Sequence, residues 1–255
     1  MAVILAIHAH PDDIETLAAG TLALLASLGH QIRIVTATAG DCGSTEHDNR
    51  ETGRIRMAEA AAAAAMIGAD YACAGFDDLS VFNDDVSRRR VTEMVRWSGA
   101  QIVLAASPVD YHPDHEAASL LVRDACFASS VPNYRTGPSA PLPDIPHLYF
   151  VDSIGGRDRD GVRIRPDFGV DIGPWMETKR RMLLAHESQQ RWVAKQHGIE
   201  DYLRSMEAWA GRRGRDFGVA QAEGFRQYKN QPYPRTPLLQ DLLGDAVLQL
   251  TDWPA

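Results

Sequence analysis

The sequence predicts an α/β protein with a mainly parallel β-sheet, helices on both faces of the sheet and an irregular carboxyl-terminal half. In the first half of the chain, short apolar runs alternate with longer segments of helical spacing. Continuous apolar runs of this length are typical of strands that are buried on both faces. Three of the helical segments end at a glycine, Gly29, Gly68 or Gly99, as many helices do. Regular alternation of strand and helix favours parallel pairing of the strands.

The elements of the first half follow from this pattern. The first helix is expected where Leu17, Leu24 and Leu25 recur at helical spacing, and a later helix contains six consecutive alanines, the best helix formers. The expected strands are 2–7, 32–35, 71–74 and 102–106, and the expected helices are 15–28, 50–67, 86–97 and 116–128.

The second half is less regular. Residues 130–146 hold five prolines and are expected to form a long surface loop. Two apolar runs, 147–151 and 168–172, are expected to be strands of a hairpin, and 174–192 and 200–209 to be helical. Because no change in composition marks a linker, residues 1–255 are expected to form a single domain.

Composition excludes several classes of function. The net charge of −8 argues against a nucleic-acid partner, because phosphate binding needs a concentrated positive surface. No run approaches the roughly 18 apolar residues of a membrane helix, and the amino-terminal apolar run is too short for a signal peptide. The three cysteines are odd in number and far apart, which suits a reducing, cytoplasmic compartment.

The tripeptide His-Pro-Asp occurs twice, at His10 and at His112, each time where an apolar strand is expected to end. The composition of a 255-residue chain predicts about 0.04 such tripeptides by chance. A strand stopped by proline and followed by an aspartate helix cap would explain each motif separately. That explanation leaves out the adjacent Asp13 and His115, so we favour a shared site.

Metal chemistry accounts for these additional residues. A catalytic zinc takes three protein ligands and leaves one position for water. His10, Asp13 and His115 can supply that set, because the carboxyl ends of parallel strands meet at one edge of the sheet. Asp12 then remains free to accept a proton from water and is the candidate general base. The same ligand types also suit iron or manganese, so another divalent metal is an alternative to zinc.

His112 would lie on the far side of the metal. As an imidazolium it could hold an oxyanion or protonate a leaving amine. Asp114 could orient His112 or cap the helix that follows, and the sequence leaves both roles open. His8 is expected on the same side of its strand as His10, in a supporting or core position.

The paired motifs His10-Pro11-Asp12-Asp13 and His112-Pro113-Asp114-His115 resemble those of the LmbE/PIG-L family of zinc-dependent N-deacetylases. The resemblance extends to Arg56-Met57-Ala58-Glu59 and, more weakly, to Glu187-Ser188-Gln189 and Ala222-Glu223-Gly224-Phe225 of its bacterial amino-sugar branch. It implies a Rossmann-like fold, zinc on His10, Asp13 and His115, Asp12 as the base and His112 as the acid or electrophilic group. It also implies a homo-oligomer, because assemblies such as hexamers occur in the family.

Two positions near the motifs leave alternatives open. Many family members have glutamate directly after the two aspartates, whereas Ile14 intervenes here and leaves the role of Glu15 in doubt. Arg56 matches an arginine that contacts substrate in the family, but it could equally form a helix salt bridge with Glu59.

The expected function is hydrolysis of an N-acetyl group on an N-acetylglucosamine-type sugar or glycoside. The alternative within enzymes is a metal-dependent amidase or carbamate hydrolase that acts on a thiol conjugate or an antibiotic intermediate. A nucleotide-binding module without chemistry is a further alternative. It would need G-x-G-x-x-G after the first strand, where this chain has His8-Ala9-His10-Pro11.

Overall fold

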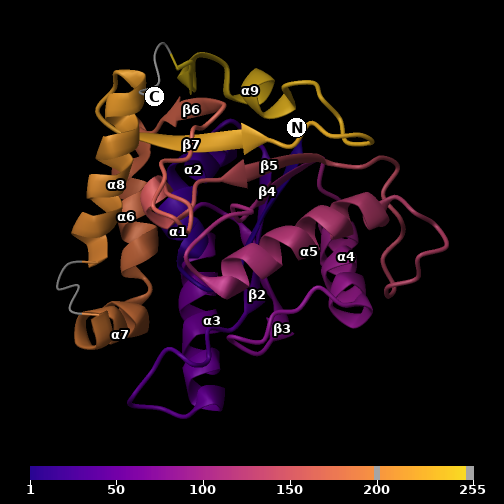
Figure 1. The fold of residues 1–255 in the computed structure, drawn as a ribbon, viewed down its shortest axis with the longest axis horizontal. Coiled ribbons are helices and arrows are strands. Elements are labelled where there is room, and N and C mark those ends of the chain that lie inside the picture. Colours follow the sequence, from indigo (N-terminus) through magenta and orange to yellow (C-terminus); the bar gives the residue numbers. More distant parts are fainter. Residues whose placement is uncertain (198–201, 251–255) are drawn as a thin grey trace.

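An eight-stranded sheet runs through the protein between layers of helices, as predicted (Figure 1). The computed structural model describes residues 1–197 and 202–250. The strands are β1 Val3–His8, β2 Gln31–Thr38, β3 Asp70–Phe76, β4 Ile102–Ala105, β5 His147–Val151, β6 Phe168–Asp171, β7 Ala222–Gln227 and β8 Val247–Leu248. The helices are α1 Asp13–Leu17, α2 Ala19–Ser27, α3 Asn49–Ala65, α4 Asp85–Ser98, α5 Pro113–Ser129, α6 Met176–Leu184, α7 Glu187–His197, α8 Tyr202–Phe217 and α9 Leu238–Leu243.

The strand order is β3-β2-β1-β4-β5-β7-β6-β8. Strands β1 to β5 pair in parallel, and β7, β6 and β8 add an antiparallel edge. From β1 the chain builds outward through β2 and β3, and then returns to the other side of β1 with β4. The carboxyl ends of β1 and β4 therefore form the switch point of the sheet, where α/β proteins bind their ligands.

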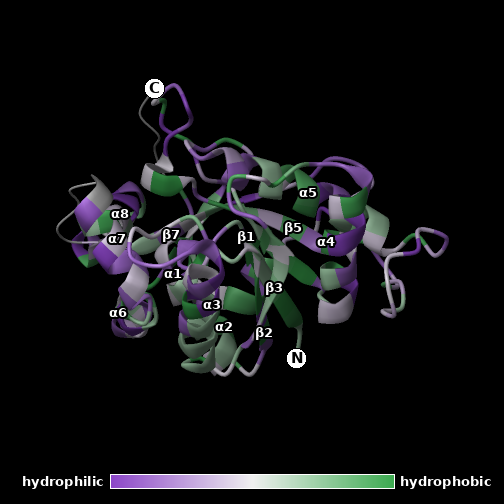
Figure 2. Ribbon diagram, turned by 90° about the horizontal axis from the view of Figure 1, so that it is seen from below, coloured by the Kyte–Doolittle hydropathy of each residue, from purple (hydrophilic) through white to green (hydrophobic). Residues whose placement is uncertain are grey.

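The sheet has an apolar core on each face because successive strand residues point to opposite sides. On β1, Ile4 and Ala6 pack under α1, α2, α3 and α6, whereas Leu5 and Ile7 pack under α4 and α5. Figure 2 shows the hydrophobic strands between these two helical layers. Burial on both faces explains why β1 is a continuous apolar run.

The predicted helix 15–28 is in fact two helices, α1 and α2, which are separated at Ala18. The interruption leaves backbone N–H groups at the start of α2 without helical partners. The carboxylate of Glu223 accepts hydrogen bonds from two of them, at Gly20 (3.0 Å) and Thr21 (2.8 Å). Because this acceptor lies on β7, local sequence spacing does not reveal the break.

The helix predicted at 116–128 begins three residues earlier, at Pro113. Proline is favoured in the first turn of a helix, where its missing N–H costs nothing. The backbone N–H of Asp114 donates to Nδ1 of His112, which caps this helix. The second His-Pro-Asp motif is therefore a helix start and not a loop.

The predicted hairpin of 147–151 and 168–172 is wrong, because β7 lies between β5 and β6 and pairs with both. The predicted helix 174–192 is divided between α6 and α7. Residues 200 and 201 of the predicted helix 200–209 lie outside the described residues, and the remainder forms the first half of α8. Residues 130–146 contain no helix or strand, as expected for a loop.

Within residues 1–197 and 202–250, no helix combines the length and apolar character needed to span a bilayer.

Candidate active site

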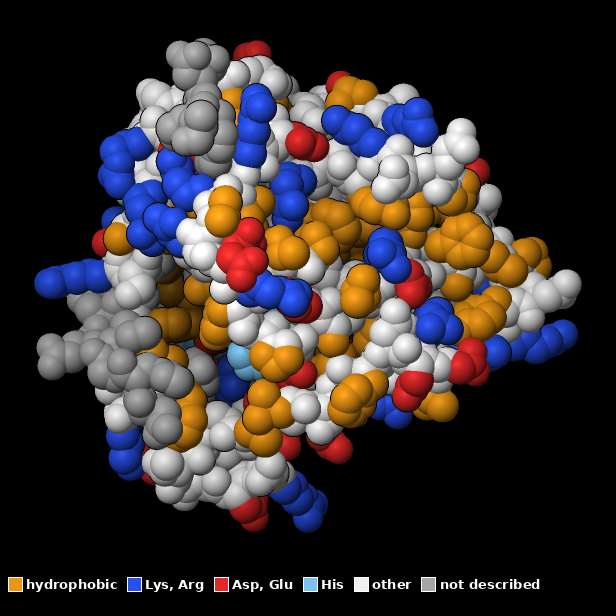
Figure 3. Space-filling view, in the orientation of Figure 1, with side chains coloured by type: hydrophobic (Ala, Val, Ile, Leu, Met, Phe, Trp, Pro, Cys, Tyr) orange, Lys and Arg blue, Asp and Glu red, His pale blue; other side chains and the backbone are white. Residues whose placement is uncertain are grey.

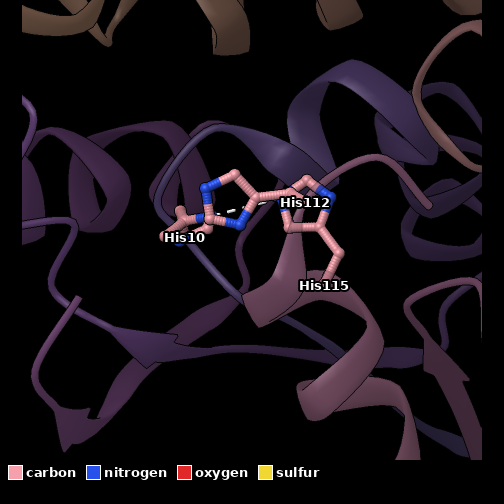
Figure 4. A group of neighbouring side chains, drawn as sticks. All are labelled: His10, His112 and His115. Atoms are coloured by element: carbon pink, nitrogen blue, oxygen red, sulfur yellow. Dashed lines mark hydrogen bonds between the residues drawn. The ribbon is translucent and has the colours of Figure 1, made fainter. Parts of the chain in front are cut away.

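The two His-Pro-Asp motifs meet at the switch point of the sheet. β1 and β4 are hydrogen-bonded neighbours, with Ile7 paired to Ala105, so the segments after the two strands emerge side by side. Figure 4 shows His10, from the segment after β1, close to His112 and His115 at the start of α5. The structure thus brings together residues that are more than a hundred positions apart in the chain.

A tight turn separates the side chains of the first motif. Asp12 has a left-handed backbone conformation with φ of 99°, which is uncommon for any residue other than glycine. Asp13 begins α1 directly after this turn. The carboxylates of Asp12 and Asp13 consequently have different partners, although the residues are adjacent in sequence.

Donor atoms of the three predicted metal ligands lie close to one another. Nδ1 of His10 lies 3.2 Å from Nε2 of His115. The carboxylate of Asp13 places one oxygen 3.3 Å from that Nδ1 and the other 3.4 Å from that Nε2. Donors at zinc-ligand distances of about 2.0–2.1 Å in tetrahedral geometry are about 3.3 Å apart. The measured separations are of this size, and the two distances to Asp13 involve different oxygens of its carboxylate.

Other ligand sets can be drawn from the same cluster. His10, His112 and His115 form one possible group, and His8, Asp13 and His115 form another. The first uses an imidazole whose Nδ1 already accepts the backbone N–H of Asp114. The second uses His8, which is fully buried and does not line the cavity described below. We therefore favour His10, Asp13 and His115.

Carboxylates and an imidazole surround these three residues and orient them. Nε2 of His10 lies 2.9 Å from Asp78. Nδ1 of His115 lies 3.3 Å from Asp110. His8 contacts Asp13 through Nδ1 at 2.7 Å. A carboxylate opposite the second ring nitrogen fixes the orientation of a metal-binding histidine.

The carboxylate of Asp114, which the sequence left open as a partner of His112, does not contact that ring; only the backbone N–H of Asp114 does. Its carboxylate lies 3.4 Å from Nε2 of His10 and accepts the backbone N–H of Leu79 at 2.7 Å. Leu79 has a positive φ of 61°, and its side chain is exposed at the site. Asp114 therefore connects the second motif to the turn after β3.

The site concentrates negative charge around its histidines. Burial opposes protonation of His10, but hydrogen bonds with Asp114, Asp13 and Asp78 outweigh it and hold the pKa of His10 well above its ordinary value. Burial likewise opposes protonation of His115, yet Asp13 and Asp110 raise its pKa to about 9. This surplus of carboxylates favours a bound cation.

Asp12 is buried beside the three donors. Its Oδ2 accepts a hydrogen bond of 2.5 Å from the hydroxyl of Tyr202, and its Oδ1 lies 3.5 Å from Arg56. Burial raises the pKa of Asp12, and the nearby Arg56 guanidinium opposes that shift only in part. A raised pKa brings a carboxylate closer to the range in which general bases work near neutral pH.

His112 is half-buried and faces the same space. Burial, together with the neighbouring His10 and His115, lowers the pKa of its imidazole. Since Nδ1 accepts a backbone N–H, the neutral ring carries its proton on Nε2. With Nδ1 as an acceptor, His112 would act as a neutral donor through Nε2–H, whereas an imidazolium was predicted from the sequence.

Arg56 is buried and forms hydrogen bonds with the backbone at and near the first motif. Its two terminal nitrogens donate to the carbonyl oxygens of Gly40 (2.7 Å) and Pro11 (2.8 Å). The carboxylate of Glu59 instead accepts the backbone N–H and the hydroxyl of Ser188. Arg56 and Glu59 therefore do not form the salt bridge that the sequence left open. Arg56 also lines the cavity.

A cavity of about 660 Å³ opens over these residues, a size typical of small-molecule sites. Figure 3 shows a histidine within a hollow that hydrophobic side chains border. Polar residues that follow β1 and β4 line one part of the cavity, and α7 and α8 line another part with both apolar and polar side chains. The apolar residues of this second part, here called the apolar wall, are Trp192, Val193, Met206 and Trp209.

Several supporting residues were not predicted. Asp78 and Asp110 follow β3 and β4, so a systematic search of the strand ends would have found them. Tyr202 lies on α8, far along the chain from Asp12, and no motif marks it. Glu15, whose role the sequence left in doubt, is buried 3.5 Å from His186, which lies between α6 and α7.

Comparison with known proteins agrees with this geometry. Residues 5–126, which contain both motifs, match the family model described as PIG-L, GlcNAc-PI de-N-acetylase. Over this region the chain is similar to the PIG-L family. Diacetylchitobiose deacetylase of Thermococcus kodakarensis is 26% identical over 242 residues, which are 88% of this chain and 82% of that protein.

Solved structures of PIG-L relatives and other proteins share the fold. N,N'-diacetylchitobiose deacetylase from Pyrococcus horikoshii superposes with a TM-score of 0.75 and 24% identity over 92% of this chain and 86% of that one. GalB, a 4-carboxy-2-hydroxymuconate hydratase from Pseudomonas putida KT2440, gives a TM-score of 0.71 and 22% identity over 92% of this chain and all of the other. Since one of these is a deacetylase and the other a hydratase, the reaction must be argued from the site.

Proposed function

We propose that this protein is a zinc-dependent hydrolase that removes the N-acetyl group from an N-acetylglucosamine-type sugar or glycoside. One observation carries the proposal. Donor atoms of His10, Asp13 and His115 lie within 3.2–3.4 Å of one another in pairs, and the carboxylate of Asp12 lies beside them in the same cavity. The family match over residues 5–126 and a deacetylase relative that is matched over 82% of its length support the same reaction.

Zinc bound at this position would polarise the acetyl carbonyl and lower the pKa of water to about 7. Asp12 accepts a proton from the attacking water as the new C–O bond forms at the acetyl carbon. Nε2–H of His112 donates a hydrogen bond to the oxygen that gains negative charge. The C–N bond then breaks, and Asp12 returns its proton to the leaving nitrogen, so the products are acetate and a free amino sugar.

The proposal is tested with the purified protein, N-acetylglucosamine and several of its glycosides. We expect acetate and free amine in equal amounts, and bound zinc near one ion per chain. Asp12→Ala should keep its zinc and lose about 10²- to 10⁴-fold in kcat. Asp144→Ala, which changes an exposed aspartate of the 130–146 loop, is the matched control and should behave as the parent protein.

Two results would contradict the proposal: a zinc-loaded protein that releases no acetate from any acetamido sugar, or an Asp12→Ala variant with the parent rate. The same geometry could cleave another amide or a carbamate. A panel that includes an acylated thiol conjugate and a carbamate separates these activities, because each substrate releases a different amine.

We also infer that residues 1–255 act as one domain, since all eight described strands belong to one sheet. A cytoplasmic location fits three cysteines that form no disulfide. A homo-oligomer, up to a hexamer, follows from the family resemblance, and light scattering of the purified protein measures its size.

A further inference from the structure

Tyr202, the first residue of α8, contacts the proposed base directly. Its hydroxyl lies 2.5 Å from Oδ2 of Asp12, and its ring lines the cavity. We propose that Tyr202 is a positioning residue that holds the Asp12 carboxylate for proton transfer. The inference rests on the proposed function, because it assumes that Asp12 is the base.

The Asp12 carboxylate needs such a partner. The turn at Pro11 fixes its backbone in a left-handed conformation, but a carboxylate can still rotate about its last side-chain bond. Arg56 holds Oδ1 only loosely, at 3.5 Å, because the guanidinium already donates to Gly40 and Pro11. The short bond from Tyr202 to Oδ2 therefore sets the orientation and leaves Oδ1 to accept the proton.

α8, which carries this hydroxyl, packs into the core. Met206 and Ala210, one and two turns after Tyr202, are each 2% exposed and belong to the core. Trp209 packs so closely on Gly156 that a Cβ there would lie 1.8 Å from its ring. The anchored helix thus connects the apolar wall of the cavity to the base.

The chemistry of Tyr202 suits this role. Burial raises the pKa of its phenol well above the ordinary value, and the nearby Asp12 charge acts in the same direction. The group therefore stays protonated and can only donate to the carboxylate. It keeps its own proton throughout the reaction, and the proton from water moves to Asp12 and on to the leaving nitrogen.

The test is Tyr202→Phe, which removes the hydroxyl and keeps the ring that packs on the cavity. We expect kcat to fall about 10- to 100-fold, with KM, zinc content and Tm close to the parent values, because only the orientation of the base is lost. Tyr149→Phe is the matched control. It also removes a buried tyrosine hydroxyl bond, to Gln240 on α9, and should leave kcat unchanged.

A double-mutant cycle distinguishes positioning from direct action. In the Asp12→Ala background, Tyr202→Phe should have no further effect, because the carboxylate on which it acts is gone. An equal loss in both backgrounds, a parent-like kcat in Tyr202→Phe, or a loss of zinc along with activity would each overturn the proposal. If the parent protein itself releases no acetate, the proposed function fails instead, so the two failures are distinguishable.

Discussion

His10 uses both of its ring nitrogens. Nδ1 points to His115 and Asp13, where a metal would lie, and Nε2 points to Asp78 at 2.9 Å. Burial opposes ionisation of Asp78, but its hydrogen bond with His10 lowers its pKa to about 2. A fully charged carboxylate in this position fixes the ring and increases the basicity of the opposite nitrogen.

We therefore predict that Asp78→Ala weakens zinc binding about 10- to 100-fold, the usual effect of removing the partner of a ligating histidine. Titration of the metal-free protein with zinc in a competing chelator measures this change. Asp77→Ala, in the same turn but exposed, is the control. Equal affinities for the two variants would show that Asp78 does not support the metal site.

At the scale of elements, a buried ion pair connects helices to the sheet. Lys179 of α6 and Glu223 of β7 are 1% and 2% exposed, and they form a short salt bridge. The same carboxylate accepts the two N–H groups at the start of α2. Glu223 thus joins three elements that are far apart in sequence.

Replacing Glu223 should destabilise the folded protein. Glu223→Ala leaves the Lys179 ammonium buried without its partner and frees two backbone donors, so we expect a loss of about 3–5 kcal/mol in the free energy of unfolding. Urea denaturation measures it. The double variant Lys179→Met, Glu223→Gln should recover part of the loss, because no unpaired charge remains buried. The exposed pair Arg89–Asp85 provides the control, and Asp85→Ala should cost below about 1 kcal/mol.

The same elements show what the sequence could predict. Strands 2–7 and 102–106 were predicted because burial on both faces requires unbroken apolar runs, and the two motifs follow directly from their ends. β7 was missed because its sequence includes Glu223 and Arg226, whose burial depends on distant partners. The division of the first helix at Ala18 was hidden for the same reason.

At the scale of the molecule, both halves of the chain line the cavity, but the proposed catalytic groups all come from the first half. All proposed ligands, the base and His112 lie within residues 10–115, inside the region that matches the family model. The apolar cavity wall on α7 and α8 lies beyond it. The half that was easiest to predict therefore contains the proposed catalytic groups, and we expect α7 and α8 to influence which substrate fits the cavity.

A metal ion bound by the proposed ligands would join segments that are far apart in the sequence. His10 and Asp13 follow β1, whereas His115 belongs to α5, so zinc would bind only when β1 and β4 are correctly paired. A ligand that binds the folded state alone at 100 times its Kd stabilises that state by about 2.7 kcal/mol. For a chain of this size we expect zinc to raise Tm by roughly 5–10 °C and a chelator to reverse the change. Thermal unfolding with and without chelator measures it.

His115→Ala should lose the response to zinc, whereas Asp144→Ala should keep it. A parent Tm that chelator leaves unchanged would mean that His10, Asp13 and His115 hold no metal in solution.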